Sequence, residues 1–171
     1  MPVPAFLNTI EQSGLSTWIR QTDSIFGFYF ILVFHTIGMA LVVGPNAVVD
    51  FILLGWVSDI PLAPFKRWFT VMWIGFWINA VSGLFLLIAY PTKAFTNPVF
   101  YVKLSLIALA LWTMQSLKTR MFGDARLSPA AIMARCRALA LCSLIFWTGA
   151  ITTGRLLAYT FRYISYGVPK G

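Results

Sequence analysis

Residues 30–44 read FILVFHTIGMALVVG, and this stretch decides the fold. Every side chain in it except those of His35 and Thr36 is apolar or only a hydrogen, and the apolar character extends over residues 25–44. A helix of about 20 residues crosses the roughly 30 Å hydrocarbon core of a bilayer. The stretch therefore predicts a transmembrane helix that carries one histidine near its middle.

Three further stretches, residues 68–90, 99–117 and 138–159, have similar length and character. The chain of 171 residues is 59% hydrophobic and 11% charged, whereas soluble domains are about 45–50% apolar and about 25% charged. Four crossings leave little chain for a soluble domain, and the connections fit one helical bundle. We therefore predict an all-α polytopic membrane four-helix bundle that forms a single domain over residues 1–171.

The N-terminal segment predicts a short interfacial helix or, as the alternative, a short irregular arm. Residues 7–18 mix apolar side chains with Asn8, Glu11 and Gln12, as do helices that lie along a membrane surface. The first 24 residues lack a basic start followed by an apolar core and a cleavage site, so we expect no cleaved signal peptide.

Prolines and capping residues mark the predicted helix boundaries. Pro45 is expected to end or kink the first helix, and Pro91 to end the second. Pairs typical of helix starts occur at Thr22–Asp23, Asn97–Pro98 and Ser128–Pro129.

Basic residues are unevenly distributed between the two ends of the predicted bundle. Connections 45–67 and 118–137 hold Lys66, Arg67, Lys118, Arg120, Arg126, Arg135 and Arg137. The opposite end holds Arg20, Lys93, Lys103, Arg155, Arg162 and Lys170. The positive-inside rule then favours cytoplasmic connections and termini on the outer side of the membrane, which is the periplasm if the membrane is the bacterial inner membrane that the resemblance described below implies. Anionic lipid headgroups explain the net charge of +8, and no basic stripe with interleaved aromatic residues indicates nucleic-acid binding.

His35 is the only histidine in the chain. Helical spacing places it on one face with Gly38, and a similar face of the second span carries Asn79 and Ser82. Both polar centres fall at mid-membrane, where an unpaired polar group costs several kcal/mol. We therefore expect neutral His35 to form a hydrogen bond with Asn79, with Ser82 or with a backbone carbonyl of a packed helix.

The alternative for this face is a cofactor site made of His35, Gly38, Asn79 and Ser82. One chain cannot supply two histidines to a haem, so a six-coordinate haem needs His35 with a methionine or His35 from two subunits. A five-coordinate haem or chlorophyll-type pigment needs only one axial imidazole and is compatible with a macrocycle shared with a partner.

A copper site is a further alternative. Imidazole, thioether and thiolate ligands suit Cu(I), and the candidate ligands are His35, Met39, Met72 and Cys142. Methionine is also a common gap-filling core residue. The cysteines Cys136 and Cys142 are six residues apart on different helix faces and are expected to be free, buried thiols.

The fourth span carries Thr152, Arg155 and Tyr159 on one face. These residues are expected to contact lipid headgroups, with Arg155 extending toward the interface, or else to hold an anionic group of a partner. Lys103 is likewise expected to extend outward, and Asp50 and Asp59 are expected to be solvated in a cytoplasmic connection. No catalytic pair is predicted within the membrane.

Three stretches carry a family resemblance: DSIFGFYFILVFHTIGMALVVG, DFILLGW and WIGFWINAVSGLFLLIAYPTKAFTNPVFYVKLSLIALAL. They resemble an uncharacterised family of small four-helix bacterial inner-membrane proteins, and they are distantly similar to the CopD-like copper-resistance membrane proteins. The closer resemblance covers about residues 22–111 and implies the fold. The distant similarity implies copper as a ligand, although the extra helices and ligands of CopD-like proteins are missing here.

The expected function is that of a non-catalytic accessory or anchoring subunit that packs against lipid and against other membrane subunits or further copies of itself. The alternative is a binding or redox protein in which His35 ligates haem, a chlorophyll-type pigment or copper. A small transporter is the third interpretation and ranks last, because no span has the central glycine–proline interruption of many carriers.

Overall fold

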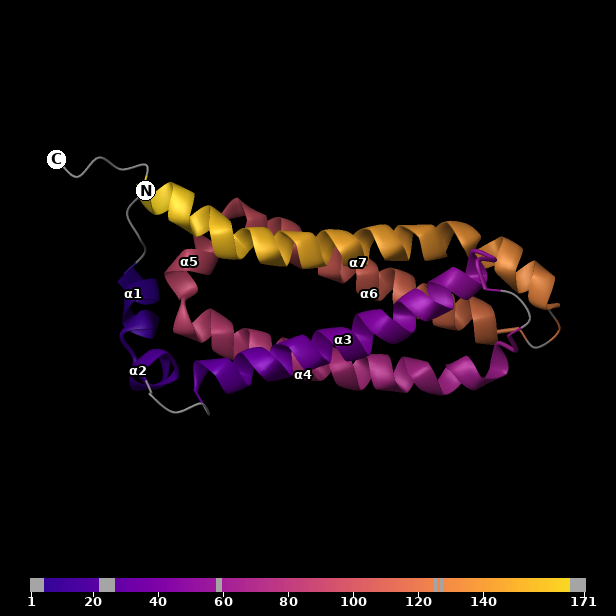
Figure 1. The fold of residues 1–171 in the computed structure, drawn as a ribbon, viewed down its shortest axis with the longest axis horizontal. Helices are drawn as coiled ribbons and strands as arrows, with labels where there is room; N and C mark the ends of the chain where they lie inside the picture. Colours follow the sequence, from indigo (N-terminus) through magenta and orange to yellow (C-terminus); the bar gives the residue numbers. More distant parts are fainter. Residues whose placement is uncertain (1–4, 22–26, 58–59, 125, 127, 167–171) are drawn as a thin grey trace.

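The apolar stretches form four long helices in the computed structural model, which describes residues 5–21, 27–57, 60–124, 126 and 128–166. They are α3 (Phe28–Leu53), α4 (Trp68–Ala89), α6 (Pro98–Phe122) and α7 (Pro129–Tyr166) (Figure 1). α3, α6 and α7 each contain an apolar segment long enough to cross a membrane. The second such segment, Ala63–Ala89, consists of α4 and the short 3-10 helix that precedes it. Only 11–28% of the residues in these apolar windows are buried inside the protein. The other residues are half-buried or exposed, and many of the exposed ones are large and apolar, as contact with lipid requires, so the predicted multi-pass helical membrane fold is confirmed.

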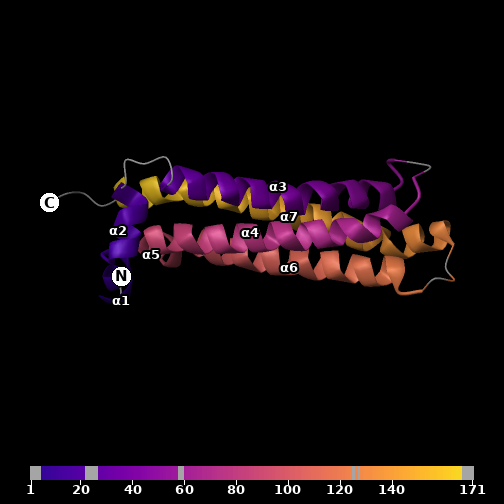
Figure 2. The same cartoon turned by 90° about the horizontal axis from the view of Figure 1, so that it is seen from below.

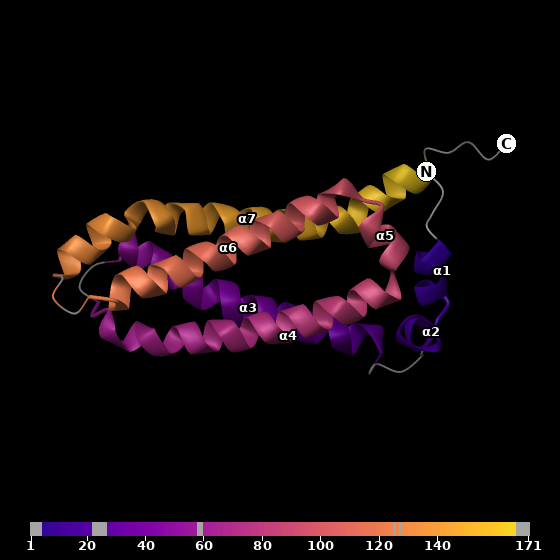
Figure 3. The ribbon, with the colours of Figure 1, turned by 180° about the vertical axis from the view of Figure 1, so that it is seen from behind.

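The long helices pair as two hairpins. α3 packs along α4, α6 packs along α7, and α3 also contacts α7. Figure 2 shows the four helices running side by side along the long axis, and Figure 3 shows the same two hairpins from behind. The N-terminal helices and the end of α7 lie at the same end of the bundle, which we call the terminal end (Figure 1). The connections after α3 and α6 lie at the other end, which we call the loop end.

The N-terminal segment forms two short helices rather than one. α1 (Ala5–Glu11) and α2 (Gly14–Gln21) lie across the terminal end of the bundle (Figure 2). Leu7 and Ile19 are buried, and Oγ of Ser16 donates a hydrogen bond to the backbone oxygen of Ala89 at 3.3 Å. The prediction of a single helix over residues 7–18 is therefore wrong, because the chain turns to cap the bundle.

Two helices are longer than predicted. α3 continues through Pro45 to Leu53, so the expected end at residue 44 is wrong. Proline removes one backbone donor, and a transmembrane helix tolerates this when neighbouring helices pack around it. α7 begins at Pro129 and has 38 residues, about 57 Å at 1.5 Å per residue. It therefore extends well beyond the predicted span 138–159.

The predicted helix starts agree with the structure where it describes them. The side chain of Asn97 accepts a hydrogen bond from the backbone N–H of Val99 at 3.0 Å, and Oγ of Ser128 accepts one from Ala131 at 3.3 Å. α4 ends at Ala89, and Pro91 opens the short helix α5 (Pro91–Phe95). Thr22 and Asp23 lie outside the described residues.

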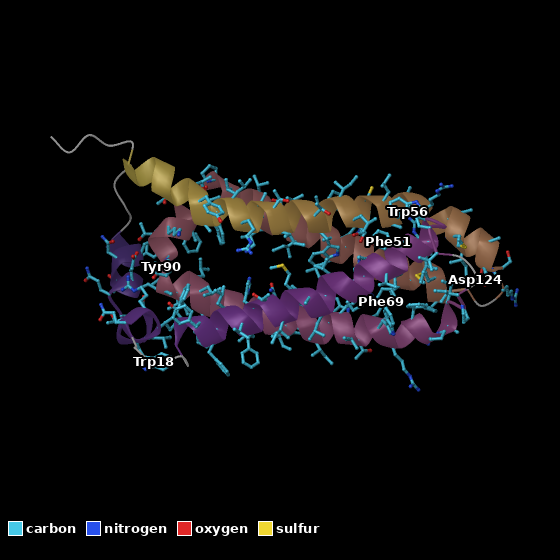
Figure 4. The ribbon with its side chains drawn as sticks, viewed as in Figure 1. Trp18, Phe51, Trp56, Phe69, Tyr90 and Asp124 are labelled. Atoms are coloured by element: carbon cyan, nitrogen blue, oxygen red, sulfur yellow. The ribbon has the colours of Figure 1, made fainter. Side chains whose placement is uncertain are left out.

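The loop half of the bundle contains the main apolar core. Side chains of all four long helices and of the 3-10 helix η1 (Ala63–Arg67) meet there, including Phe65, Phe69, Met72, Met114 and Cys136. Figure 4 shows Phe69 inside this half and shows Phe51 and Trp56 together at its end. The rings of Phe51 and Trp56 are stacked with centroids 5.3 Å apart. The two hairpins are thus joined firmly at the loop end.

Candidate functional site

His35 and Asn79 face each other across the contact between α3 and α4. Nδ1 of His35 lies 3.0 Å from the backbone oxygen of Asn79 and 3.2 Å from Oγ of Ser82. In return, Nδ2 of Asn79 donates to the backbone oxygen of His35 at 2.7 Å. The predicted hydrogen bonding of His35 with the second span is confirmed.

Glycines bring the two backbones together one turn from His35. A Cβ on Gly38 would lie 2.6 Å from the backbone nitrogen of Asn79, and a Cβ on Gly75 would lie 2.7 Å from Cβ of Leu41. Neither position has room for a side chain, so glycine at both sets the distance between α3 and α4. Gly38 therefore acts on the position of His35 through helix packing.

The hydrogen bonds assign the proton on the imidazole of His35. The hydroxyl of Ser82 donates to the backbone oxygen of Ile78 at 2.6 Å, so its oxygen offers a lone pair to His35. Both neighbours of Nδ1 are then acceptors, and Nδ1 carries the hydrogen. In the neutral ring Nε2 then keeps a free electron pair, and no residue that the structure describes forms a hydrogen bond with it. Histidines that ligate metals are held in this way, with the other ring nitrogen donating to a carbonyl.

A cavity of about 250 Å³, which we call the cleft, lies between the two hairpins on the terminal side of His35. Its polar lining comes from His35, Lys93 and Lys103, and its walls include the rings of Phe28, Tyr90 and Phe100. Figure 4 shows Tyr90 at the terminal end of the bundle. Arg20 of α2 lies over the Tyr90 ring, 5.8 Å from its centroid. The cleft therefore combines aromatic surface with basic side chains.

Glycines also make room for the polar side chains of the cleft. A Cβ on Gly83 would lie 3.1 Å from Cε1 of His35, and a Cβ on Gly154 would lie 3.6 Å from Cε of Lys103. Lys103 is half-exposed and lines the cleft, and its extension toward the membrane interface stays a prediction. In the described part of the chain, its ammonium group has no acidic partner.

A second, smaller cavity of about 30 Å³ lies deeper in the bundle and shares His35 and Lys103 with the cleft. Met39 and Trp147 also line it. Nε1 of Trp147 is buried and has no hydrogen-bond partner among the described residues. The volume is about that of one water molecule, so the polar region around His35 extends toward the centre of the bundle.

The structure separates the candidate copper ligands. His35 and Met39 border the same small cavity, but Met72 is fully buried in the core of the loop half. Met72 precedes Asn79 by seven residues, which is about 10 Å along α4. Cys142 precedes Ile151, another residue of the small cavity, by nine residues or about 13 Å. No group of three His, Cys, Asp or Glu residues suited to a metal is found in the described part of the chain.

The fourth-span residues lie on the outside of the bundle. Thr152, Arg155 and Tyr159 are all exposed, and none of them lines the cleft or the small cavity. The hydroxyl of Thr152 donates to the backbone oxygen of Thr148 at 2.8 Å, which is a hydrogen bond within its own helix. This face is therefore exposed on the bundle, and its contact with lipid headgroups or with a partner stays a prediction.

α3 and α7 share a buried polar cluster that the sequence patterns did not predict. Nδ2 of Asn46 lies 2.7 Å from Oδ2 of Asp50 and 2.7 Å from Oγ of Ser143 on α7. All three residues are almost fully buried, and Oδ1 of Asp50 has no partner among the described residues. The expectation that Asp50 is solvated is wrong, because α3 continues past Pro45 and carries it into the bundle. Asp59, of which the same was expected, lies outside the described residues. The spacing of four between Asn46 and Asp50 is the signal that could have revealed this shared face.

Comparisons of this chain with protein-family models, with curated proteins and with solved structures find no match. The candidate site is therefore argued from the geometry of the chain alone.

Proposed function

We propose that this chain is a non-catalytic accessory subunit of a bacterial inner membrane that holds an amphipathic, anionic cofactor in the cleft. In this proposal His35 supplies one axial imidazole to a tetrapyrrole, either a haem or a chlorophyll-type pigment. A neighbouring subunit, or a second copy of the chain, covers the rest of the macrocycle. The resemblance to small four-helix inner-membrane proteins is part of the proposal and supports its location.

The observation that carries the proposal is the oriented imidazole. Nδ1–H of His35 is held by the backbone oxygen of Asn79 and by Oγ of Ser82, which leaves Nε2 as an electron-pair donor beside the cleft. A histidine whose only role is to form hydrogen bonds between packed helices needs no adjoining cavity. A ligating histidine needs both the free nitrogen and the space next to it.

The charge and size of the cleft favour a tetrapyrrole over a bare metal ion. Lys103 and Lys93 place positive charge on its walls, which repels a cation and attracts the carboxylates of a macrocycle. The volume of about 250 Å³ is below the roughly 300–1,000 Å³ of pockets that enclose a whole drug-sized ligand. The macrocycle would extend beyond the chain, which is why we propose that a partner completes the site.

Optical absorption of the full chain, purified from native membranes in mild detergent, tests this function. We expect a visible band of a bound tetrapyrrole that is lost in His35→Ala. Binding of free haem should be lost in His35→Gly and restored by adding imidazole, which can enter the space left by the ring and act as the axial ligand. Arg155→Met is the matched control, because it removes one positive charge outside the cleft.

Three results would contradict the proposal. They are a colourless native preparation that also fails to bind added haem, a band that survives His35→Ala, and a band lost equally in Arg155→Met. Circular dichroism of each variant separates loss of the site from loss of the fold.

A further inference from the structure

The loop end carries a basic pocket that the proposed function does not use. Its cavity of about 410 Å³ is lined by Ala63, Pro64, Lys66, Arg67, Thr70 and Lys118. We call it the basic pocket. It lies at the opposite end of the bundle from the cleft, so the two sites are independent.

Both hairpins contribute to the basic pocket. Lys66 and Arg67 belong to η1, and Thr70 lies in the first turn of α4, whereas Lys118 comes from α6 of the other hairpin. Phe65 fixes η1 in place, because its side chain is buried in the core and its ring packs edge-on against Trp68 with centroids 4.6 Å apart. Three basic residues thus line one cavity, two on η1, which Phe65 anchors in the core, and one on α6.

Within the described part of the chain, nothing neutralises these three side chains. Lys66, Arg67 and Lys118 form no ion pair there, and the ion pair that is found, Arg20–Glu11, lies at the terminal end. Asp124 is exposed on the connection after α6, and Asp50 is buried inside the bundle. A pocket of this charge is built for an anion, and its guanidinium, ammonium and hydroxyl donors match a phosphate group.

The position of the pocket identifies the source of the phosphate. Lys66 and Arg67 immediately precede the apolar part of α4, and Lys118 lies four residues before the end of α6. Farther along α4, away from the loop end, Val71 and Ile74 are exposed and apolar. A group bound here would have its phosphate among the basic side chains and its acyl chains against α4. We infer that the basic pocket binds the phosphate of one anionic phospholipid, at headgroup depth.

Native mass spectrometry of the full chain tests this inference, with phosphatidylglycerol and phosphatidylcholine as probes in a neutral detergent. We expect one phosphatidylglycerol to bind per chain in preference to phosphatidylcholine. Each basic residue near a membrane surface contributes about fivefold to binding of anionic lipid. The triple variant Lys66→Gln, Arg67→Gln, Lys118→Gln should therefore bind phosphatidylglycerol roughly a hundredfold more weakly.

The matched control is Arg120→Gln, Arg135→Gln, Arg137→Gln, which removes the same charge from the same end but not from the pocket. Because none of these three arginines lines the pocket, and the probe is a single lipid instead of a charged membrane surface, we expect this control to weaken binding by less than about fivefold in total. Equal losses of phosphatidylglycerol affinity in the two triple variants would mean that the lipid is attracted by the total positive charge of the loop end, and they would overturn the inference. Equal binding of both lipids by the unmodified chain would also overturn it.

Inorganic phosphate and glycerol phosphate distinguish a lipid from a free anion. We expect neither to displace phosphatidylglycerol at equal concentration, because they lack acyl chains to contact α4. Displacement by either one would reassign the pocket to a soluble phosphate and contradict the lipid inference. Thermal unfolding of both triple variants checks that the bundle stays folded.

Discussion

Two polar clusters involve different halves of α3, one half-buried around His35 and one almost fully buried around Asn46. His35 with Asn79 and Ser82 lies within the first hairpin and borders two cavities. Asn46 with Asp50 and Ser143 joins the two hairpins and is almost fully buried. Asn46 follows His35 by eleven residues, or about 16 Å along α3.

The difference separates binding from packing. In the His35 cluster one ring nitrogen is used for packing and the other remains available next to open space. In the Asn46 cluster the amide is committed to both partners, and none of the cavities described above reaches it. A buried polar group that specifies how helices pair needs no access, whereas a ligand site does.

The largest effect is expected from a variant that forces apart the close contact between α3 and α4 and leaves the side chains of His35, Asn79 and Ser82 unchanged. Gly38→Ala places a Cβ 2.6 Å from the backbone nitrogen of Asn79, so the helices must separate. We expect a loss of about 3 kcal/mol or more in stability, because backbone cannot move aside as a side chain can. Thermal unfolding in detergent measures it. Gly44→Ala is the matched control, because nothing lies within 4 Å of its Cβ, and an equal loss there would refute the close-contact argument.

Replacing one residue of the second cluster should lower the stability of the fold more than replacing two of its residues together. Asn46→Leu leaves Asp50 and Ser143 buried without their donor, and we expect it to cost about 3 kcal/mol. The double variant Asn46→Leu, Asp50→Leu removes the stranded carboxylate and should recover more than half of that loss. A double-mutant cycle by chemical unfolding measures the coupling. Additive losses would show that the two side chains do not act together.

Ser82→Ala should affect binding more than folding. The variant removes one of the two acceptors of Nδ1–H while the backbone oxygen of Asn79 remains. We expect affinity for added haem to fall about tenfold, with a stability change below about 1 kcal/mol. Absorption titration and thermal unfolding on the same sample separate the two quantities. A large loss of stability with unchanged affinity would instead assign the His35 cluster a packing role like that of Asn46.

The smallest effect is expected on the outer face of α7. Arg155→Gln removes an exposed charge that lines neither the cleft nor the small cavity, and we expect a stability change within about 0.5 kcal/mol. Haem affinity should stay unchanged. A tenfold loss of haem affinity in this variant would show that the anionic group binds outside the cleft.

The sequence predicted what local periodicity controls. Apolar runs located the four long helices, and helical spacing placed His35 and Asn79 at one depth, where they form reciprocal hydrogen bonds. Asn97 and Ser128 could be recognised as caps because a cap depends on neighbouring residues only.

The features that the sequence did not predict depend on contacts between distant segments. Whether Pro45 ends α3 is decided by the packing of α3 against α7, which no local pattern records. The burial of Asp50 and the cleft that Lys103 lines follow from how the two hairpins dock. The basic pocket has the same origin, since its charges come from both hairpins.

The arrangement of contacts also implies an order of assembly. The close approach at Gly38 and Gly75 and the hydrogen bonds between His35 and Asn79 all lie within residues 35–82. The first hairpin can therefore form as soon as α4 enters the bilayer, before α6 has been synthesised. The bond from Asn46 to Ser143 forms only when α7 arrives. The cleft is therefore created last, when the second hairpin packs against the first hairpin and encloses it.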